Sequence, residues 1–254
     1  MTLLILCGFA LLAGFIDAVA GGGGLIQLPP LLITQKEVAP AFILGTNKFA
    51  AVTGTATAAV SYNRRVKVNW RIVVPGMISA AICSWLGARA VSLIRPELFR
   101  PIMLVLIIAM ALYTFKRKDF GSAARQTKAS LTPIPYVLGF CGLIGFYDGI
   151  FGPGTGSLLM FAFVGILGFD FLQASATTKI INVTTNVAAL VQFLGAGQII
   201  WHLAVPMAVC NILGGIIGSR MAMAKGSQFV RVVFLVVVVG VILRYGYDII
   251  QEFI

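Results

Sequence analysis

The sequence has few charged residues for its length. Only 11% of its 254 residues are charged, whereas 59% are hydrophobic and the mean hydropathy is +0.98. So few polar side chains cannot cover a water-soluble surface. Several apolar runs reach the roughly 20 residues that a helix needs to cross a bilayer. The sequence therefore predicts an all-α polytopic membrane protein with the lipid bilayer as its partner.

Cysteine and histidine are also scarce. The cysteines lie in apolar stretches without a Cys-x-x-Cys spacing or a nearby histidine, so we interpret them as small buried hydrophobic residues. His202, the only histidine, lies at a predicted membrane edge, where an interfacial role is favoured over proton relay. No nucleophile has a nearby base, which argues against an enzyme, and we expect no cofactor or metal. The cysteines are Cys7, Cys83, Cys141 and Cys210.

Acidic residues are outnumbered by basic ones, which gives a formal net charge of +11. The basic residues gather in two segments between apolar runs, residues 63–71 and 116–128. Cytoplasmic loops of membrane proteins are enriched in lysine and arginine in this way. We therefore attribute the charge to membrane topology and expect no nucleic-acid binding.

The most informative feature that is present is an internal repeat. The segment GFIDAVAGGGGL, which begins at Gly14, returns as GFYDGIFGPGTG from Gly145, an offset of 131 residues. The same offset relates Thr46 and Lys48 to Thr177 and Lys179, Trp70 to Trp201, Gly87 to Gly218 and Arg100 to Arg231. So long a period in a very apolar chain is typical of a transporter built from two structural halves with a site between them.

Apolar runs and their breakers divide the chain into two membrane repeats, residues 1–115 and 134–254, joined by a basic linker at 116–133. Each repeat is expected to contain about four long helices and one short segment that follows a glycine-rich break. The expected helices are 2–19, 39–62, 71–92, 98–115, 134–150, 171–194, 201–223 and 228–250, and the short segments are 25–34 and one that ends at 168.

The charge pattern favours inverted repeats. Residues 63–71 are basic, whereas their counterpart GAGQIIWH has no lysine or arginine, and the basic residues of the second half, Arg220, Lys225 and Arg231, surround the next turn. The positive-inside rule then places residues 63–71 and the turn near Lys225 in the cytoplasm. A parallel arrangement of the halves remains an alternative, because Arg95 and Arg100 weaken the contrast.

Four charged residues lie within apolar runs, in two pairs that the repeat relates: Asp17 with Asp148, and Lys48 with Lys179. A charge at the centre of the bilayer costs about 2.5–3.5 kcal/mol even on insertion scales, so each of them needs a partner or water. One interpretation is two Asp/Lys bridges that lock the halves together. The other is a permeation path, because a buried pair contributes little net stability compared with an apolar replacement.

The glycine-rich breaks predict donors of hydrogen bonds within the membrane. Helices that restart near Leu25 and Ser157 would present free N–H groups and a partial positive charge, which favour an anion. The alternative is that the glycines only allow close helix packing, as we expect for Gly214, Gly215 and Gly218. The candidate amide donors are Gly22, Gly23, Gly24, Gly154, Thr155 and Gly156.

Polar side chains cluster beside the two lysines. A single hydroxyl or amide in a helix usually bonds to the backbone or to a neighbouring helix. Their clustering beside Lys48 and Lys179 favours instead a cage for a small oxyanion, in which the aspartates act as proton sites or counter-charges. The candidates are Thr46, Asn47, Thr178 and Asn182.

Five segments carry a resemblance to a known family: AGFIDAVAGGGGL, LGTNK, GFYDGIFGPGTGS, TTKIINVTTN and GGIIGSRMA. They resemble the TauE/SafE family of sulfite and organosulfonate exporters, also called the toluene sulfonate uptake permease family. The resemblance implies a multi-pass permease of the inner membrane that moves small sulfur-containing anions such as sulfite or sulfoacetate. The linker and the terminal QEFI carry no resemblance.

The sequence thus predicts a secondary transporter that binds a small oxyanion between its repeats and works by alternating access. A passive anion channel with the same architecture is the alternative. The identity of the anion, the direction of transport, the coupling ion, the Asp/Lys pairing and a homo-oligomeric state stay open at this stage.

Overall fold

The computed structural model describes residues 2–94, 98–99, 101–103, 105–106, 109, 134–169 and 171–225. These residues are helical with short connections, and no strand occurs among them. The predicted helix 228–250 and linker 116–133 lie outside the described residues, and the predicted helix 98–115 lies mostly outside them. The helices are α1 (Thr2–Ala20), α2 (Gly23–Thr34), α3 (Pro40–Asn63), α4 (Trp70–Ala90), the 3-10 turn η1 (Val91–Leu93), α6 (Ile134–Ile150), α7 (Thr155–Gly165), α8 (Phe171–Gly195) and α9 (Trp201–Lys225).

Local sequence explains several helix ends. Pro40 begins α3, at a position where a missing backbone N–H costs nothing. Asn69 caps α4 by accepting a hydrogen bond from the Arg71 N–H at 3.2 Å. Within the described residues, three segments are long and apolar enough to cross a membrane: α1, α4 with η1, and α9. The prediction of an all-α membrane protein is therefore confirmed.

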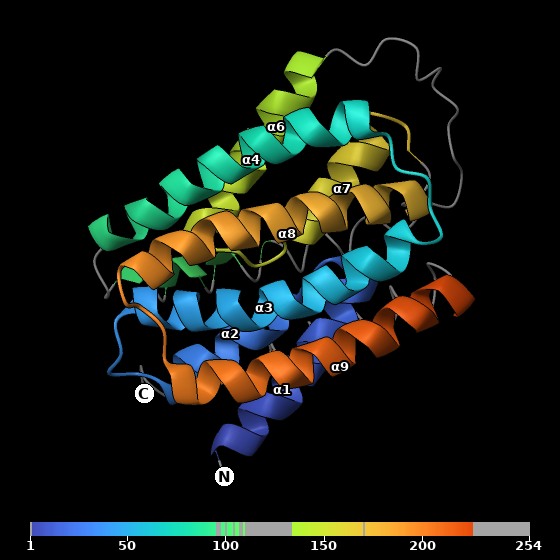
Figure 1. Ribbon diagram of the computed structural model, residues 1–254. Helices are drawn as coiled ribbons and strands as arrows, with labels where there is room; N and C mark the ends of the chain where they lie inside the picture. Colours follow the sequence, from blue (N-terminus) through green and yellow to red (C-terminus); the bar gives the residue numbers. More distant parts are fainter. Residues whose placement is uncertain are drawn as a thin grey trace.

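The two halves are interlocked. The helix α4 of the first half packs against α6 and α8 of the second, and α9 of the second half packs against α1 and α3 of the first (Figure 1). The offset of 131 residues relates α4 to α9, α1 to α6 and α3 to α8. The packing therefore repeats in equivalent form on both sides of the molecule.

Glycines allow these helices to approach closely. A Cβ atom at Gly87 of α4 would collide with the backbone oxygen of Phe146 in α6, and one at Gly218 of α9 would collide with that of Phe15 in α1. These two contacts are equivalent under the repeat. Gly214 and Gly215 also face the backbone of neighbouring helices, so the prediction that the glycines of α9 serve helix packing is confirmed.

The central helices α3 and α8 lie side by side and run in opposite directions, as the colour gradient in Figure 1 shows. Near the start of α3, the Thr46 hydroxyl accepts a hydrogen bond from the N–H of Ile200, just beyond the end of α8. Near the end of α3, Tyr62 packs in the same buried cluster as Ala176, close to the start of α8. Equivalent helices of the two halves are thus antiparallel in the centre of the molecule.

The two glycine-rich breaks meet each other. The N–H of Ser157 donates to the backbone oxygen of Gly21 at 2.9 Å, and a Cβ at Gly21 or Gly156 would collide with the other residue. The helices begin at Gly23 and Thr155, two residues before the predicted starts near Leu25 and Ser157. Sequence could not mark these starts, because neither helix has a capping side chain. The short helices α2 and α7 therefore both begin near the middle of the molecule.

Candidate anion site

Two buried ion pairs join the halves at the point where the breaks meet. The Lys48 ammonium of α3 lies 2.6 Å from Asp148 Oδ2 of α6, and the Lys179 ammonium of α8 lies 3.2 Å from Asp17 Oδ2 of α1. The ammonium of Lys179 also donates a hydrogen bond to the backbone oxygen of Asp17. Both lysines are at most 1% exposed. The repeat relates one pair to the other, and each pair crosses between the halves.

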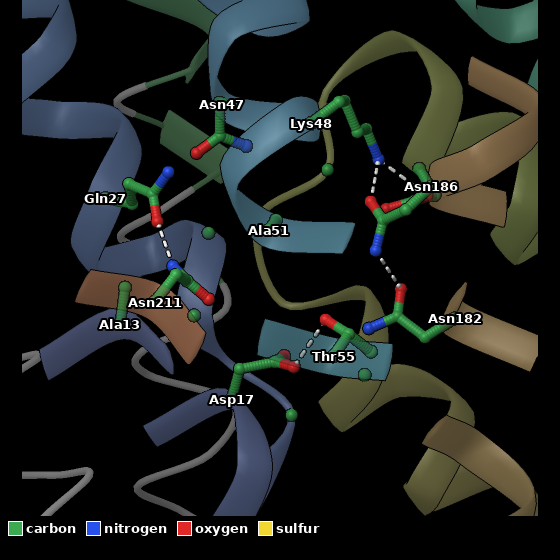
Figure 2. Close-up of a pocket in the computed structure, with 16 residues that line it drawn as sticks. Ala13, Asp17, Gln27, Asn47, Lys48, Ala51, Thr55, Asn182, Asn186 and Asn211 are labelled. Carbon is green, nitrogen blue, oxygen red and sulfur yellow. Dashed lines mark hydrogen bonds and ion pairs between the residues drawn. The ribbon is translucent and has the colours of Figure 1, made fainter. Parts of the chain in front are cut away.

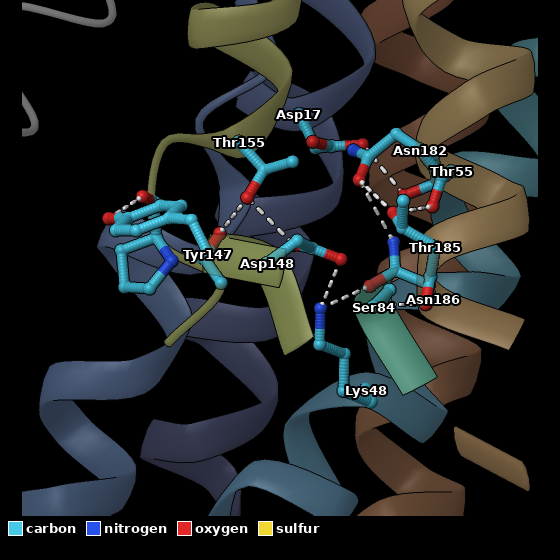
Figure 3. A network of polar contacts seen from close by, with 12 residues as sticks. Asp17, Lys48, Thr55, Ser84, Tyr147, Asp148, Thr155, Asn182, Thr185 and Asn186 are labelled. Atoms are coloured by element: carbon cyan, nitrogen blue, oxygen red, sulfur yellow. Dashed lines mark hydrogen bonds and ion pairs between the residues drawn. The ribbon is translucent and has the colours of Figure 1, made fainter. Parts of the chain in front are cut away.

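Hydroxyl and amide groups surround these pairs (Figure 3). The Thr155 hydroxyl donates to Asp148 Oδ1 at 2.7 Å, and Asn186 Oδ1 accepts from Lys48 at 3.0 Å. The Thr55 hydroxyl donates to Asp17 Oδ2 at 2.8 Å. Each carboxylate therefore has a lysine and a threonine as partners, which reduces the cost of burying its charge.

A small, partly enclosed cavity lies between Lys48 and Asp17 (Figure 2). The volume that the centre of a water molecule can occupy in it is about 20 Å³. One water needs at least roughly 10–15 Å³ on this measure, so the cavity has room for a single water and is too small for an oxyanion in this conformation. The residues lining it are Ala13, Asp17, Gly21, Gly23, Gly24, Gln27, Asn47, Lys48, Ala51, Thr55, Asp148, Gly152, Gly156, Asn182, Asn186 and Asn211.

Two short helices point their first turns at this cavity. Gly23 and Gly24 at the start of α2, with Gly152 and Gly156 around the start of α7, form part of its wall. The first N–H groups of a helix have no partner within the helix and carry a partial positive charge. The expectation of free N–H groups at Leu25 and Ser157 is wrong, because Leu25 donates to Gly22 and Ser157 donates to Gly21. The two lysines and two aspartates balance in formal charge, so these helix ends add a surplus positive potential.

The structure brings about half of the predicted site residues to the cavity. Lys179 is turned toward Asp17, and Thr155 toward Asp148, so both contribute through the ion pairs. Thr46 connects α3 to the loop before α9, away from the cavity. Predicted residues that line the cavity are Asp17, Gly23, Gly24, Asn47, Lys48, Asp148, Gly156 and Asn182, whereas Gly22, Thr46, Gly154, Thr155, Thr178 and Lys179 do not.

Eight of the sixteen residues of the cavity wall were not predicted, and four of these are polar: Gln27, Thr55, Asn186 and Asn211. Gln27 comes from the short helix α2, and Asn211 comes from the middle of α9. Both are isolated amides in apolar helices. A polar side chain in a membrane helix usually bonds to another helix, and this was the signal available in the sequence. Nothing in the sequence places α9 beside α2, so their proximity follows from the packing of α9 against α1 and α3.

The cysteines are free, and Cys141 is the buried one, whereas Cys7, Cys83 and Cys210 are half-buried. The interpretation of all four as buried residues is therefore wrong for three of them, because these helix faces point partly outward. Within the described part of the chain, no group of three or more His, Cys, Asp or Glu residues is arranged to hold a metal ion.

A polytopic helical fold with a buried charged site between two related halves is the architecture of a membrane transporter. The model of the sulfite exporter TauE/SafE family matches residues 6–245, and the chain belongs to this family. The protein is thus a membrane transporter and not an enzyme.

Curated relatives agree with this assignment. A probable membrane transporter protein, ORF9, from Sinorhizobium sp is 38% identical over 92% of this chain and 88% of its own length. One from Haemophilus influenzae is 37% identical over 98% of this chain and 95% of its own, and YfcA from Escherichia coli is 34% identical over 94% and 87%. No solved structure matches the chain.

Proposed function

We propose that this protein is a secondary transporter of small sulfur-containing oxyanions, such as sulfite or organosulfonates, that binds its substrate between the two halves. The observation that carries the proposal is the pair of ion pairs between the halves, Lys48 with Asp148 and Lys179 with Asp17, beside one small cavity. Buried bridges contribute little stability compared with apolar packing, so their presence in both halves favours a functional role.

In the proposed mechanism, the substrate replaces a carboxylate. Asp148 now occupies the position beside Lys48 that an oxyanion would take. When the anion arrives, its oxygens accept hydrogen bonds from Lys48 and from the amides at the start of α2 and α7. The displaced carboxylate of Asp148 then takes up a proton or finds another cation, because an unpaired buried charge is costly. This exchange couples the anion to a proton.

In this proposal the two halves are inverted repeats, which allows the site between them to open to either side of the membrane in turn. One observation in support is that α3 and α8 are antiparallel. A second is which loops lie together at each end of the molecule. Val66, in the loop after α3, shares a buried cluster with Ala222 near the end of α9. The proposal therefore places residues 63–71 and Lys225 together on the cytoplasmic side, and the Gly197 loop on the opposite side.

The size of the cavity supports a carrier over the alternative of a passive channel. A volume of about 20 Å³ beside the Lys48–Asp148 pair leaves no room for an oxyanion to pass in this conformation. A carrier must open this site to one side at a time, whereas a channel would open it to both.

Flux into proteoliposomes tests the proposal. Purified protein should accumulate at least one of sulfite, thiosulfate and small sulfonates, and an imposed pH gradient should change the rate. Equal rates with and without the gradient would favour the channel. Absence of flux and of binding for every one of these anions would remove the proposed function.

Topology is tested separately by cysteine labelling. On a cysteine-free background, single cysteines at Asn63 and Gly197 should react differently with an impermeant thiol reagent in intact cells. Labelling is expected at Gly197 and not at Asn63. The reverse pattern would contradict the proposed orientation, and labelling at both positions would contradict inverted halves.

A further inference from the structure

Three buried amides lie on the side of the cavity opposite the Lys48 ammonium (Figure 2). They are Gln27 of α2, Asn47 of α3 and Asn211 of α9, with 1%, 3% and 2% of their surfaces exposed. We call these three residues the amide subsite. Neither lysine donates a hydrogen bond to these three side chains, so their role differs from that of the bridges.

Asn211 fixes the orientation of Gln27. Its side-chain nitrogen donates to Gln27 Oε1 at 2.6 Å and to the backbone oxygen of Ala10 at 3.1 Å, which uses both of its N–H groups. Gly54 of α3 leaves the space that the Asn211 amide fills, because a Cβ there would collide with Asn211 Oδ1. With its oxygen engaged, Gln27 presents its nitrogen as a donor.

Two polar atoms of the amide subsite have no partner. They are the donor Nε2 of Gln27 and the acceptor Oδ1 of Asn47. Figure 2 shows the two amides turned toward one another, and both residues line the cavity. Buried polar groups in folded proteins are nearly always bonded, so an unpaired donor and an unpaired acceptor at one cavity suit one hydroxyl, either that of a water or that of a ligand which displaces it.

A hydroxyl group meets this requirement, because its oxygen can accept from Gln27 while its proton is donated to Asn47. An alkyl group would leave both atoms unpaired, and a second anionic group would place negative charge against the Asn47 oxygen. We propose that the amide subsite recognises a hydroxyl on the uncharged part of the substrate, while the anionic head binds at Lys48. This inference rests on the proposed function, because it requires an anion at Lys48.

The amide subsite belongs to one side of the molecule. The repeat relates Gln27 to Leu158, Asn211 to Ala80 and Asn47 to Thr178. The other side of the molecule therefore has no counterpart of the hydrogen-bonded pair Gln27 and Asn211. The site therefore receives its substrate in a single orientation, with the anionic head toward Lys48 and the hydroxyl toward Gln27.

A matched pair of probes tests the inference: ethanesulfonate and 2-hydroxyethanesulfonate, titrated calorimetrically into the purified full chain. The wild type is expected to bind the hydroxylated probe roughly 10-fold more tightly, the effect of about one well-made hydrogen bond. Gln27→Leu, which installs the residue of the equivalent position 158, should abolish this preference and leave the affinity for ethanesulfonate within about 2-fold.

Two further variants keep the test decisive. Thr178→Val removes a third unpaired buried polar atom, the Thr178 hydroxyl, which lies outside the cavity wall, and should keep the full preference. Asn47→Leu should lose the preference as Gln27→Leu does, and it replaces Gln27→Leu if that variant fails to fold by its melting temperature.

The outcomes separate the inference from the proposed function. Equal affinity of the wild type for both probes, or a preference that survives Gln27→Leu and Asn47→Leu, would overturn the amide subsite. Binding of sulfite with binding of neither sulfonate would overturn it as well and leave the transporter of sulfur oxyanions standing. Failure to bind any of these anions would remove both.

Discussion

Lys48 and Lys179 occupy the same position in the two halves, but their surroundings differ. Lys48 pairs with Asp148 at 2.6 Å, bonds to Asn186 and lines the cavity. Lys179 pairs with Asp17 at 3.2 Å, donates to a backbone oxygen and does not line the cavity. In the proposed mechanism, the first bridge exchanges with a substrate and the second holds α8 to α1.

The largest expected effect is a loss of anion affinity when Lys48, rather than Lys179, is replaced. Lys48→Met should weaken anion binding by about 30- to 3,000-fold, because it removes the cation of a desolvated site. Calorimetric titration with the best-bound sulfur anion measures this loss. Transport at the wild-type rate by the double variant Lys48→Met with Asp148→Asn would show that the lysine does not touch the anion and serves only as a bridge.

The next effect concerns stability. Lys179→Met should lower the free energy of unfolding by about 3 to 5 kcal/mol, because it leaves Asp17 charged, buried and unpaired. Adding Asp17→Asn should restore most of this loss, as judged by the melting temperature in detergent. If the double variant is no more stable than Lys179→Met alone, the ion pair of Lys179 with Asp17 does not hold α8 to α1.

A smaller effect tests whether the halves pack equivalently. Gly87→Ala and Gly218→Ala each place a Cβ against a backbone oxygen of α6 or α1, and each should lower stability by about 1 to 3 kcal/mol. Gly8→Ala and Gly139→Ala are the matched controls, because no atom lies within 4 Å of their added Cβ. Similar melting temperatures for all four variants would contradict the close contacts between halves.

The smallest effect concerns the hydroxyls that support each carboxylate. Thr155→Val and Thr55→Val each remove one hydrogen bond to a buried carboxylate, worth about 1.5 kcal/mol. Loss of the Thr155 bond should alter anion affinity measured by titration, because Asp148 is the carboxylate placed for exchange. Equal changes in affinity for the two variants would mean that both bridges exchange with the substrate.

Hydropathy and the repeat made most of the fold predictable. The helices α1, α6, α8 and α9 begin and end within about two residues of their predicted bounds, because apolar runs and their breakers are local signals. The equivalence of Asp17 with Asp148 and of Lys48 with Lys179 was also predictable from the sequence, because it depends only on the constant offset of 131 residues between the repeats. That two aspartates and two lysines need partners followed from the cost of charge in a membrane.

The pairing and the cavity were decided by tertiary structure. Two aspartates and two lysines allow two ways of forming bridges, and only the packing of α3 beside α6 and of α8 beside α1 selects between them. Gln27 and Asn211 lie 184 positions apart and carry no shared motif, so no local pattern links them. The sequence by itself determined a duplicated, apolar chain with buried charges, because composition and register are properties of the chain in one dimension. Which charge neutralises which, and which amide is left without a partner, depends on contacts between helices that only the folded molecule brings together.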